Sequence, residues 1–495
     1  MKPNIVLIVA DTARASNFSL YGHEKETAPN LESIADECTL YTNTIATAPW
    51  TMPSHASIFT GQNSSHHGST RSSPQLADDK ETLHQILSAN GYSNWLITAN
   101  PGISSVTNGD FEEFLTRRRI PTGTDYTEVK SAFKSSGFGL STFKTIFEFL
   151  RNGGRFADMI NLADKYFLNQ VEKWATNPRR FTRKGSKNNL KFFSKLCNHS
   201  NKPYFAYVNI MEPHLQYMPP KESRRKFAPD GVSDKELWSV NQDPRLFNYA
   251  KAVDMDERDF ELLEALYNGS LHYTDQIVGK MYDHLKQTDQ LDDTLFIFIG
   301  DHGENIGDKG LIGHSLSLND SLLRVPMVIS YPENSGGDVR EQLVQLHDLF
   351  PTILEEAGIT DQVSGKDAVQ LPKEESDKGR DYAIAEYLGS PFKGIQNIIE
   401  KYPEVDYSQY DYEVKSIYSD QAEKFTIYST GESTLEKVRI DGETEIDDSD
   451  SSDRKTELRD ELFARVDDFG ETDGRIDSSN VPKDIEDKLK NLGYI

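Results

Sequence analysis

The sequence has very few cysteines: only 2 occur in 495 residues, Cys38 and Cys197. This number excludes a disulfide framework and a cysteine-rich metal site. No apolar run approaches the ~20 residues that a membrane span needs. The apolar stretch over residues 5–10 is also too short for an ordinary signal peptide. We therefore expect a cytoplasmic protein with reduced thiols and no transmembrane segment.

Basic residues are scarce relative to acidic ones, with 54 Lys and Arg against 79 Asp and Glu, a net charge of −25. A chain this acidic is repelled by phosphate backbones and anionic lipids, which argues against nucleic acid as a partner. Hydrophobic residues still make up 36% of the sequence and aromatic residues 10%. These fractions support a sizeable core and exclude global disorder.

Four short apolar runs have the composition of strands buried on both faces, because they are continuous and rich in β-branched residues. Segments with the pattern of helices lie between them. The alternation predicts an α/β fold in which a mostly parallel sheet is covered by helices on both faces. The expected strands are 5–10, 204–210, 294–299 and 325–330, and the expected helices are 29–37, 80–90, 259–286 and 341–357.

The pattern changes near residue 380, where short strands and turns replace the long helices. Residues 424–428 and 435–440 are strand-like, the acidic and Ser-rich segment 441–453 is typical of a solvated loop, and 482–492 has the pattern of a final helix. We therefore expect a catalytic α/β domain over 1–360. A small acidic C-terminal α+β subdomain with antiparallel strands follows over 380–495.

The segment 116–202 differs from the rest of the chain in charge. It contains 18 basic and 6 acidic residues, a net charge of 18 − 6 = +12 in a chain of −25. The simpler interpretation is an insertion held electrostatically against an acidic body. The alternative is a lid that attracts a large anionic substrate, such as a charged glycan or a lipid head group.

Four polar residues directly follow predicted strands: Asp11, His214, Asp301 and His302. In open α/β sheets, ligands bind beyond the carboxyl ends of the strands. Carboxylates and an imidazole are metal ligands, and catalytic metal sites combine three protein ligands with an open position. We predict that Asp11, Asp301 and His302 bind a divalent metal ion.

The segment 48–61 contains a threonine, Thr51, two residues before Pro53. Proline suits the first turn of a helix, and a hydroxyl residue just before it suits the helix start. Free N–H groups and the helix dipole favour an anion at that position. Thr51 is therefore either a simple helix cap or a reactive hydroxyl beside an anion site.

The order and spacing of several segments resemble the sulfatase family within the alkaline phosphatase superfamily. The resemblance spans most of the chain except 116–202. It implies the sulfatase fold and an ester hydrolase that uses a metal ion. The segments are 3–11, 28–31, 53–61, 212–214 with 219–220, 300–304, 313–314, 323–326 and 489–494.

The resemblance also reveals departures from the family. Sulfatases oxidise a Cys or Ser to formylglycine in a C/S-x-P-x-R signature, whereas here Thr51 stands at the nucleophile position and His55 at the arginine. Threonine cannot form the aldehyde, because its Cβ carries a methyl group. The chain is thus similar to superfamily phosphodiesterases and phosphotransferases that attack with a threonine alkoxide. The family's Gly-Lys-Trp-His stretch is replaced by residues 98–101, which leaves Asn100 as the substrate-binding candidate there.

The remaining roles follow from the same resemblance. His302 stands where many sulfatases have an asparagine that binds calcium. Imidazole is a better ligand for zinc or manganese than for calcium, so we expect zinc or manganese, with calcium or magnesium as alternatives. His214 and His314 match positions that bind the substrate oxyanion. We expect His314 or His55 to protonate the leaving oxygen, and Arg14 to help stabilise the transition state.

We expect a metal-dependent hydrolase of phosphate or sulfate esters in which Thr51, activated by the metal, attacks phosphorus or sulfur. Phosphoryl substrates are favoured, because a formylglycine hydrate can expel sulfate through its second hydroxyl and a threonine sulfate cannot. One alternative is a phosphotransferase that acts on a glycan or lipid head group. The other is a catalytically silent protein that binds anions. The oligomeric state is left open.

Overall fold

The computed structural model describes residues 2–115, 185–200 and 203–469, with short gaps inside these ranges. Of the basic insertion 116–202, residues 116–184 and 201–202 lie outside the described residues, as does the helix expected over 482–492. The gaps fall at 78, 101, 108–110, 333–335, 361–366, 391, 441 and 447–450.

The core of the fold is an eight-stranded sheet in the order β11-β2-β10-β7-β1-β6-β4-β5. All the strands run parallel except β10, which is antiparallel to both of its neighbours. The predicted mostly parallel α/β sheet is therefore confirmed. The strands are β1 (Asn4–Ala10), β2 (Thr39–Tyr41), β4 (Ser93–Thr98), β5 (Glu112–Leu115), β6 (Tyr204–Ile210), β7 (Thr294–Gly300), β10 (Met327–Ser330) and β11 (Asp338–Arg340).

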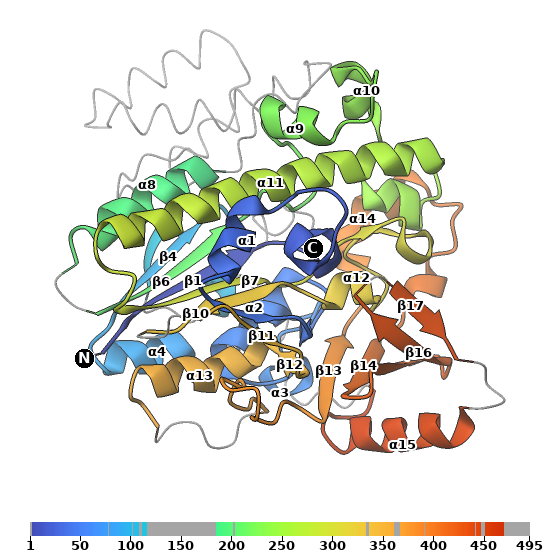
Figure 1. The fold of residues 1–495 in the computed structure, drawn as a ribbon. Coiled ribbons are helices and arrows are strands. Elements are labelled where there is room, and N and C mark those ends of the chain that lie inside the picture. Colours follow the sequence, from blue (N-terminus) through green and yellow to red (C-terminus); the bar gives the residue numbers. More distant parts are fainter. Residues whose placement is uncertain are drawn as a thin grey trace, which may run out of the picture.

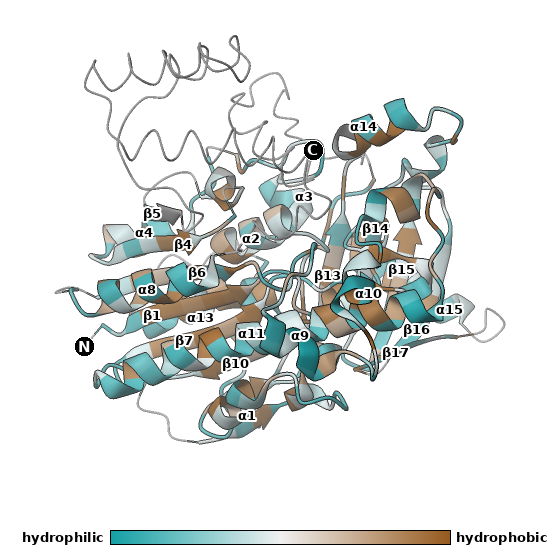
Figure 2. Ribbon diagram, turned by 90° about the horizontal axis from the view of Figure 1, so that it is seen from above, coloured by the Kyte–Doolittle hydropathy of each residue, from teal (hydrophilic) through white to brown (hydrophobic). Residues whose placement is uncertain are grey.

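Helices cover both faces of this sheet, as Figure 1 shows. Side chains alternate along β1, so that Ile5, Leu7 and Val9 pack into one core while Val6 and Ile8 pack into the other. The first core lies against α2 (Thr51–Thr60), α4 (Leu83–Ala89) and α13 (Leu349–Glu356). The second lies against α1 (Pro29–Ala35), α8 (Ser186–Cys197) and α11 (Glu257–Gln287). In Figure 2 the central strands are brown, whereas the covering helices show both colours.

Shorter elements connect these layers and carry the loops around the carboxyl ends of the strands. Within the described residues, no helix has both the length and the apolar character needed to cross a bilayer. The short elements are α3 (Ser64–His67), α9 (Lys221–Phe227), α10 (Asp234–Ser239), α12 (Asp320–Leu323), α14 (Phe392–Lys401), β3 (Thr44–Ile45), β8 (Asn305–Ile306), β9 (Ile312–Gly313) and β12 (Val344–Gln345).

A second, five-stranded sheet follows the α/β sheet and is antiparallel throughout. Figure 1 places it beside the central sheet, with one helix, α15 (Ser452–Phe463), against it. This confirms the antiparallel C-terminal strands that the sequence predicted. The strands are β13 (Tyr382–Tyr387), β14 (Val414–Ser419), β15 (Glu423–Tyr428), β16 (Ser433–Arg439) and β17 (Gly442–Glu445).

Two expected elements were wrong. The helix expected over 341–357 begins only at Leu349, because the residues before it form β12 and a 3₁₀ turn. The segment 441–453, expected as a solvated loop, contains β17 and the start of α15. At least one acidic residue of this segment is paired within the fold: Glu443 forms ion pairs with Lys309 and the buried Lys424. These cations lower the pKa of Glu443 to about 2.

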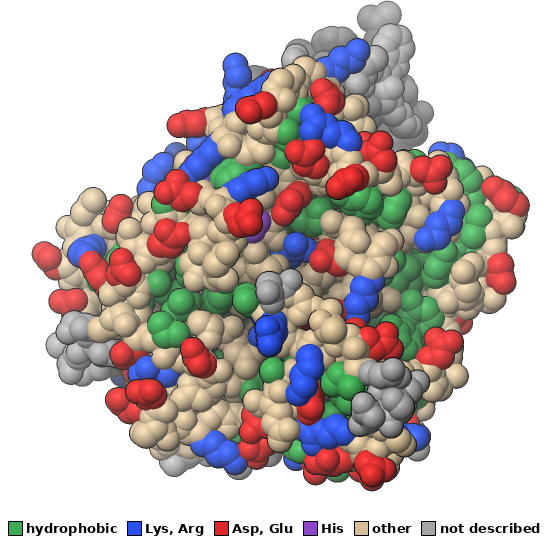
Figure 3. All heavy atoms as spheres, turned by 45° about the vertical axis from the view of Figure 1, so that its right-hand side comes forward, with side chains coloured by type: hydrophobic (Ala, Val, Ile, Leu, Met, Phe, Trp, Pro, Cys, Tyr) green, Lys and Arg blue, Asp and Glu red, His purple; other side chains and the backbone are tan. Residues whose placement is uncertain are grey.

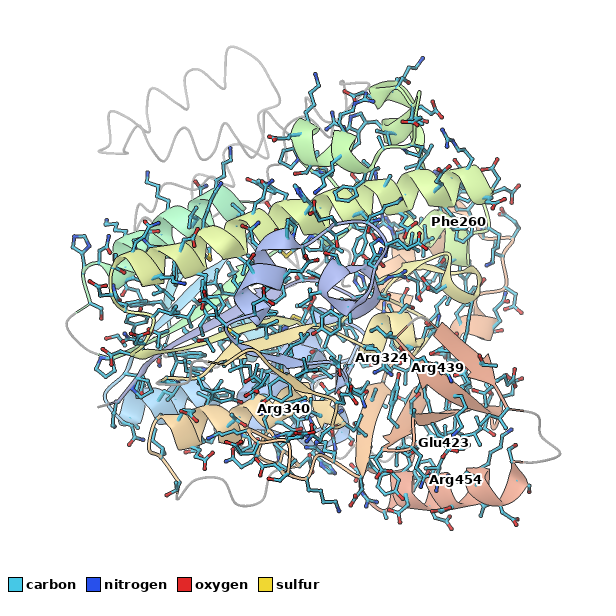
Figure 4. All side chains as sticks on the ribbon, viewed as in Figure 1. Phe260, Arg324, Arg340, Glu423, Arg439 and Arg454 are labelled. Atoms are coloured by element: carbon cyan, nitrogen blue, oxygen red, sulfur yellow. The ribbon has the colours of Figure 1, made fainter. Side chains whose placement is uncertain are left out.

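Charged pairs also join the two sheets. Arg324, which ends α12, pairs with Asp320, whose carboxylate accepts a hydrogen bond from Tyr418 on β14. Figure 4 labels Arg324 and Arg439 near this junction, and Glu423 with its ion-pair partner Arg454 below it. Acidic and basic side chains are interspersed over the face shown in Figure 3. On this face the excess of acidic residues therefore does not gather into one patch.

Gly303 packs tightly against the backbone, and this contact gives a testable prediction. A Cβ at position 303 would overlap the carbonyl oxygen of Ser321 and lie 2.8 Å from the Cβ of Arg14. We expect Gly303→Ala to lower the free energy of unfolding by about 1–3 kcal/mol, because overpacking forces the backbone to shift. Chemical denaturation measures this change. Gly336→Ala is the control, since its Cβ would meet only Asp338 Oδ2 at 3.9 Å; equal stabilities of the two variants would contradict the prediction.

Candidate active site and metal centre

The strand register brings Asp11 and Asp301 together. β1 and β7 are parallel neighbours in which Ala10 pairs with Gly300, so each aspartate is the first residue after its strand. Ligand atoms of Asp11, Asp301 and His302 all lie within 4.8 Å of one another, and all three residues are buried. The three residues predicted as metal ligands therefore form one cluster.

Local backbone contacts orient this cluster. Asp301 Oδ1 accepts hydrogen bonds from the backbone N–H groups of Thr12 (3.0 Å) and His302 (2.9 Å). Thr12 adopts a left-handed conformation with φ of 60°, which is uncommon outside glycine and concentrated at functional sites. His302 Nδ1 donates to the carbonyl oxygen of Gly303 (2.9 Å). This bond leaves the lone pair on His302 Nε2 directed at the cluster, as metal-binding histidines require.

The two aspartates are electrostatically unsatisfied. Burial, and then repulsion by Asp301, raise the pKa of Asp11 to about 7. Burial raises the pKa of Asp301 to about 8. Both carboxylate oxygens of Asp11 and Oδ2 of Asp301 are buried without a hydrogen-bond partner in the described part of the chain, although Asn100 lies close enough to help lower the pKa of Asp11. Buried, unpaired carboxylates are costly, and these oxygens with the His302 imidazole fit a divalent cation.

Thr51 lies beside this cluster. It is the first residue of α2, fully buried, and its Oγ1 is 3.4 Å from His302 Nε2. Ser54, one turn further along α2, donates from its hydroxyl to the carbonyl oxygen of Asp301 (2.6 Å). The start of the helix is thus fixed to the end of β7. The N–H groups and dipole of the helix start favour an anion at this position.

His55 also lies at the cluster, on the same helix. Its Nδ1 donates to the carbonyl oxygen of Thr51 (2.8 Å) and is 3.5 Å from Asp301 Oδ2. Its ring packs edge-on against Tyr207, with 5.7 Å between the ring centroids. Burial lowers the pKa of His55 to about 3. His55 is therefore a neutral imidazole that supports the backbone of Thr51.

His214 and His314 border the cluster from another side. The centroid of the His314 ring lies 4.9 Å from that of His302 and 5.1 Å from that of His214. His314 Nδ1 is 2.9 Å from Oε1 of the buried Glu304. Burial lowers the pKa of His314 to about 4. The sequence pattern alone predicts no role for Glu304, although Glu304 belongs to the same segment, 300–304, as the candidate ligands Asp301 and His302.

Arg14 and Asn100 are placed differently. The guanidinium of Arg14 forms an ion pair with Asp308 (2.8 Å) and donates to the carbonyl oxygen of Glu304 (3.2 Å). It lines a hollow between the two sheets that contains none of the three metal-ligand candidates. Asn100 follows β4 and lies next to Asp11. Arg14 therefore supports the residues that carry His314, whereas Asn100 lies at the cluster.

Comparison with known proteins identifies the family. Residues 3–359 match the family model described as Sulfatase. The chain belongs to the sulfatase family. This confirms the family expected from the motifs and the assignment to the ester hydrolases.

The relatives of this sulfatase-family chain are named for several different activities. It is 25% identical over 422 residues to an arylsulfatase from Clostridium perfringens, covering 78% of this chain and 82% of the relative. It is 24% identical to a multifunctional alkaline phosphatase superfamily protein from Trinickia caryophylli, covering 72% and 74%. The solved phosphonate monoester hydrolase of Agrobacterium radiobacter has the same fold, with a TM-score of 0.65, 19% identity and coverage of 93% and 95%.

The metal-ligand cluster gives a second prediction. We expect the purified protein to contain zinc or manganese, and Asp301→Asn and His302→Ala to remove it, because each change removes one ligand. Elemental analysis of the wild type and both variants measures the metal. Asp308→Asn is a control, since Asp308 lies near the site but pairs with Arg14. Full calcium occupancy with no transition metal would contradict the choice of ion.

His67 gives a pH-dependent prediction. It is fully buried behind α2, its Nδ1 accepts from the Ser69 N–H (3.1 Å), and its Nε2 therefore donates to Ser57 Oγ (3.0 Å). Burial lowers its pKa to about 3, from 6.5 in the unfolded chain. Between these values the unfolded chain binds more protons, so stability should fall as the pH drops from 6.5 toward 3, by up to about 1.4 kcal/mol per pH unit.

Denaturation curves at several pH values measure this dependence. His67→Gln should reduce the slope, whereas His199→Gln is the control, a change at an exposed histidine whose described side-chain hydrogen bond is to the Lys195 carbonyl oxygen. Identical slopes in the wild type and both variants would show that His67 contributes nothing to the pH dependence.

Proposed function

We propose that this sulfatase-family protein hydrolyses phosphate or sulfate esters with the unmodified hydroxyl of Thr51 as the nucleophile. The observation that carries the proposal is the position of Thr51. Its Oγ1 lies at the start of α2, 3.4 Å from His302 Nε2 and beside two buried, unpaired carboxylates. A threonine that served only as a helix cap would not need these neighbours.

Asp11, Asp301 and His302 would hold the divalent ion, with zinc or manganese favoured. A bound cation would lower the pKa of a nearby hydroxyl and offset negative charge on an ester oxygen. Burial raises the pKa of both aspartates, and this supports the assignment because added positive charge would offset the cost of two buried carboxylates. A silent anion-binding protein would not benefit from two buried carboxylates.

The chain's own residues would carry out the remaining steps. Thr51 Oγ forms a bond to phosphorus or sulfur while the bond to the alcohol oxygen breaks, and water later releases the acid from Thr51. The N–H groups at the start of α2 and the His214 imidazole bind the anionic oxygens. Because Glu304 holds His314 Nδ1, Nε2 is the atom that protonates the leaving oxygen. A bound ester anion raises the pKa of His314 and so favours this protonation.

Phosphoryl esters suit this mechanism better than sulfate esters. A threonine phosphate can be hydrolysed by water, whereas a sulfated threonine lacks the second hydroxyl through which a formylglycine hydrate expels sulfate. The names of the relatives include both sulfatases and a phosphonate monoester hydrolase. A turnover panel of p-nitrophenyl phosphate, p-nitrophenyl sulfate, p-nitrophenyl phenylphosphonate and bis-p-nitrophenyl phosphate, each with zinc, manganese, magnesium and calcium, separates these classes.

The nucleophile gives the next prediction. We expect Thr51→Ala to reduce kcat on the best ester of the panel by about 10³-fold or more, because the bond-forming oxygen is lost. Thr51→Ser keeps the hydroxyl and should retain activity within about tenfold. Both variants should keep the wild-type melting temperature and metal content. A folded, metal-loaded Thr51→Ala protein with near wild-type turnover would overturn the assignment.

A further inference from the structure

Arg71 lies in the loop after α3 and is fixed to the end of β13. Its backbone N–H donates to the carbonyl oxygen of Leu388 (3.0 Å). Its guanidinium donates to the hydroxyl of Tyr387 (3.0 Å) and lies 5.5 Å from the centroid of that ring. It also lies 5.9 Å from the centroid of the Trp50 ring. Figure 1 shows α3 beside β13, the arrangement that places the loop here.

No carboxylate neutralises this guanidinium within the described residues. Every other described arginine that is not exposed forms an ion pair with an aspartate or glutamate, and the chain has 79 acidic residues available. Arg71 instead contacts two aromatic rings and a hydroxyl, which leave its charge intact. A partly buried, unpaired guanidinium is a binding site for an oxyanion.

The Arg71 guanidinium lies on the His314 side of the candidate active site. Trp50 directly precedes Thr51, and the charge of Arg71 is one of the influences that lower the pKa of His314. Asn100, by contrast, lies next to Asp11. His314 is the residue that would protonate the leaving oxygen, so Arg71 lies on the side of the alcohol that leaves.

We propose that Arg71 determines substrate specificity by binding a second anionic group on the alcohol part of the ester, a carboxylate or another oxyanion. The proposal rests on the proposed ester hydrolysis, because that reaction defines the alcohol side. A planar guanidinium held between rings binds such a group through two hydrogen bonds at once. The favoured substrate is then an ester of an acidic alcohol, and a neutral aryl alcohol lacks this contact.

Two aryl alcohols that differ only in charge test the proposal: 4-hydroxybenzoate, which is charged, and methyl 4-hydroxybenzoate, which is neutral. The phenol oxygen of each is esterified with the acid, phosphoric or sulfuric, whose esters the wild type hydrolyses. The 3-hydroxy isomers are tested in the same way. For the wild type we expect kcat/KM to be higher for the carboxylates. Arg71→Gln should reduce kcat/KM for at least one carboxylate about 10- to 100-fold, with a much smaller change for the methyl esters, which share only the effect of Arg71 on His314. Arg71→Lys should keep part of the preference for the carboxylates, because lysine keeps the positive charge but cannot donate two parallel hydrogen bonds.

Arg465→Gln is the matched control. Arg465 lies 4.8 Å from the ring of Tyr382, at the opposite end of β13, so the variant removes a similar arginine–ring contact away from the site. It should leave both classes of ester unaffected. An equal loss for charged and neutral esters in Arg71→Gln, or no loss for either, would overturn the proposal.

A binding measurement separates this proposal from the proposed reaction. 4-Sulfobenzoate and its methyl ester are sulfonates that cannot be hydrolysed at the sulfur–carbon bond. The carboxylate form should raise the melting temperature of the wild type more than the methyl ester does, and Arg71→Gln should abolish the difference. If no ester in the panel turns over, the proposed reaction fails, and this binding difference alone decides the role of Arg71. Equal shifts for both compounds in the wild type would overturn it.

Discussion

The carboxylates of Asp11 and Asp301 are buried side by side and repel each other, and the surrounding structure holds them there. Burial, and then repulsion by Asp301, raise the pKa of Asp11 to about 7, and burial raises the pKa of Asp301 to about 8. Nothing in the described residues offers either group a full positive charge at close range, since His302, between them, has a lowered pKa of about 4. A site with this deficit of positive charge favours a cation, and a cation held by Asp11, Asp301 and His302 would lower the pKa of the Thr51 hydroxyl beside it.

The fold tolerates this repulsion because the surrounding backbone is held tightly. Strand register fixes the two aspartates next to each other, and close packing at Gly300 and Gly303 leaves the loop after β7 no room to relax. The start of α2 is held from two directions, by Ser54 on the carbonyl of Asp301 and by His67 on Ser57. Such rigidity is what electrostatic catalysis requires, since preorganised groups need not rearrange during the reaction.

The sequence predicted the parts of the site that follow from local pattern. Asp11 and Asp301 could be placed because each follows a continuous apolar strand, and Thr51 because proline marks the start of its helix. Distant pairing was not predictable. The acidic residues of 441–453 favoured a solvent-exposed loop, and the ion pair between Glu443 and Lys424 became evident only in the structure. Arg14 resembled an anion-binding residue, but its partner Asp308 is almost 300 residues away in sequence. No local pattern marked Arg71, since its role depends on rings from two other segments.

If Arg71 has the proposed role, the C-terminal sheet contributes to the site as well as to the core. Successive residues of β13 point to opposite faces, and two of them hold α3 and the loop after it. Glu386 accepts hydrogen bonds from the backbone and side chain of Ser65 and pairs with the buried Lys415, while Tyr387 holds the Arg71 guanidinium. The three candidate metal ligands, by contrast, all follow strands of the central sheet. If both proposals hold, the metal-binding cluster and alcohol recognition depend on different sheets, and substitutions along β13 should alter which alcohol binds more than they alter metal binding.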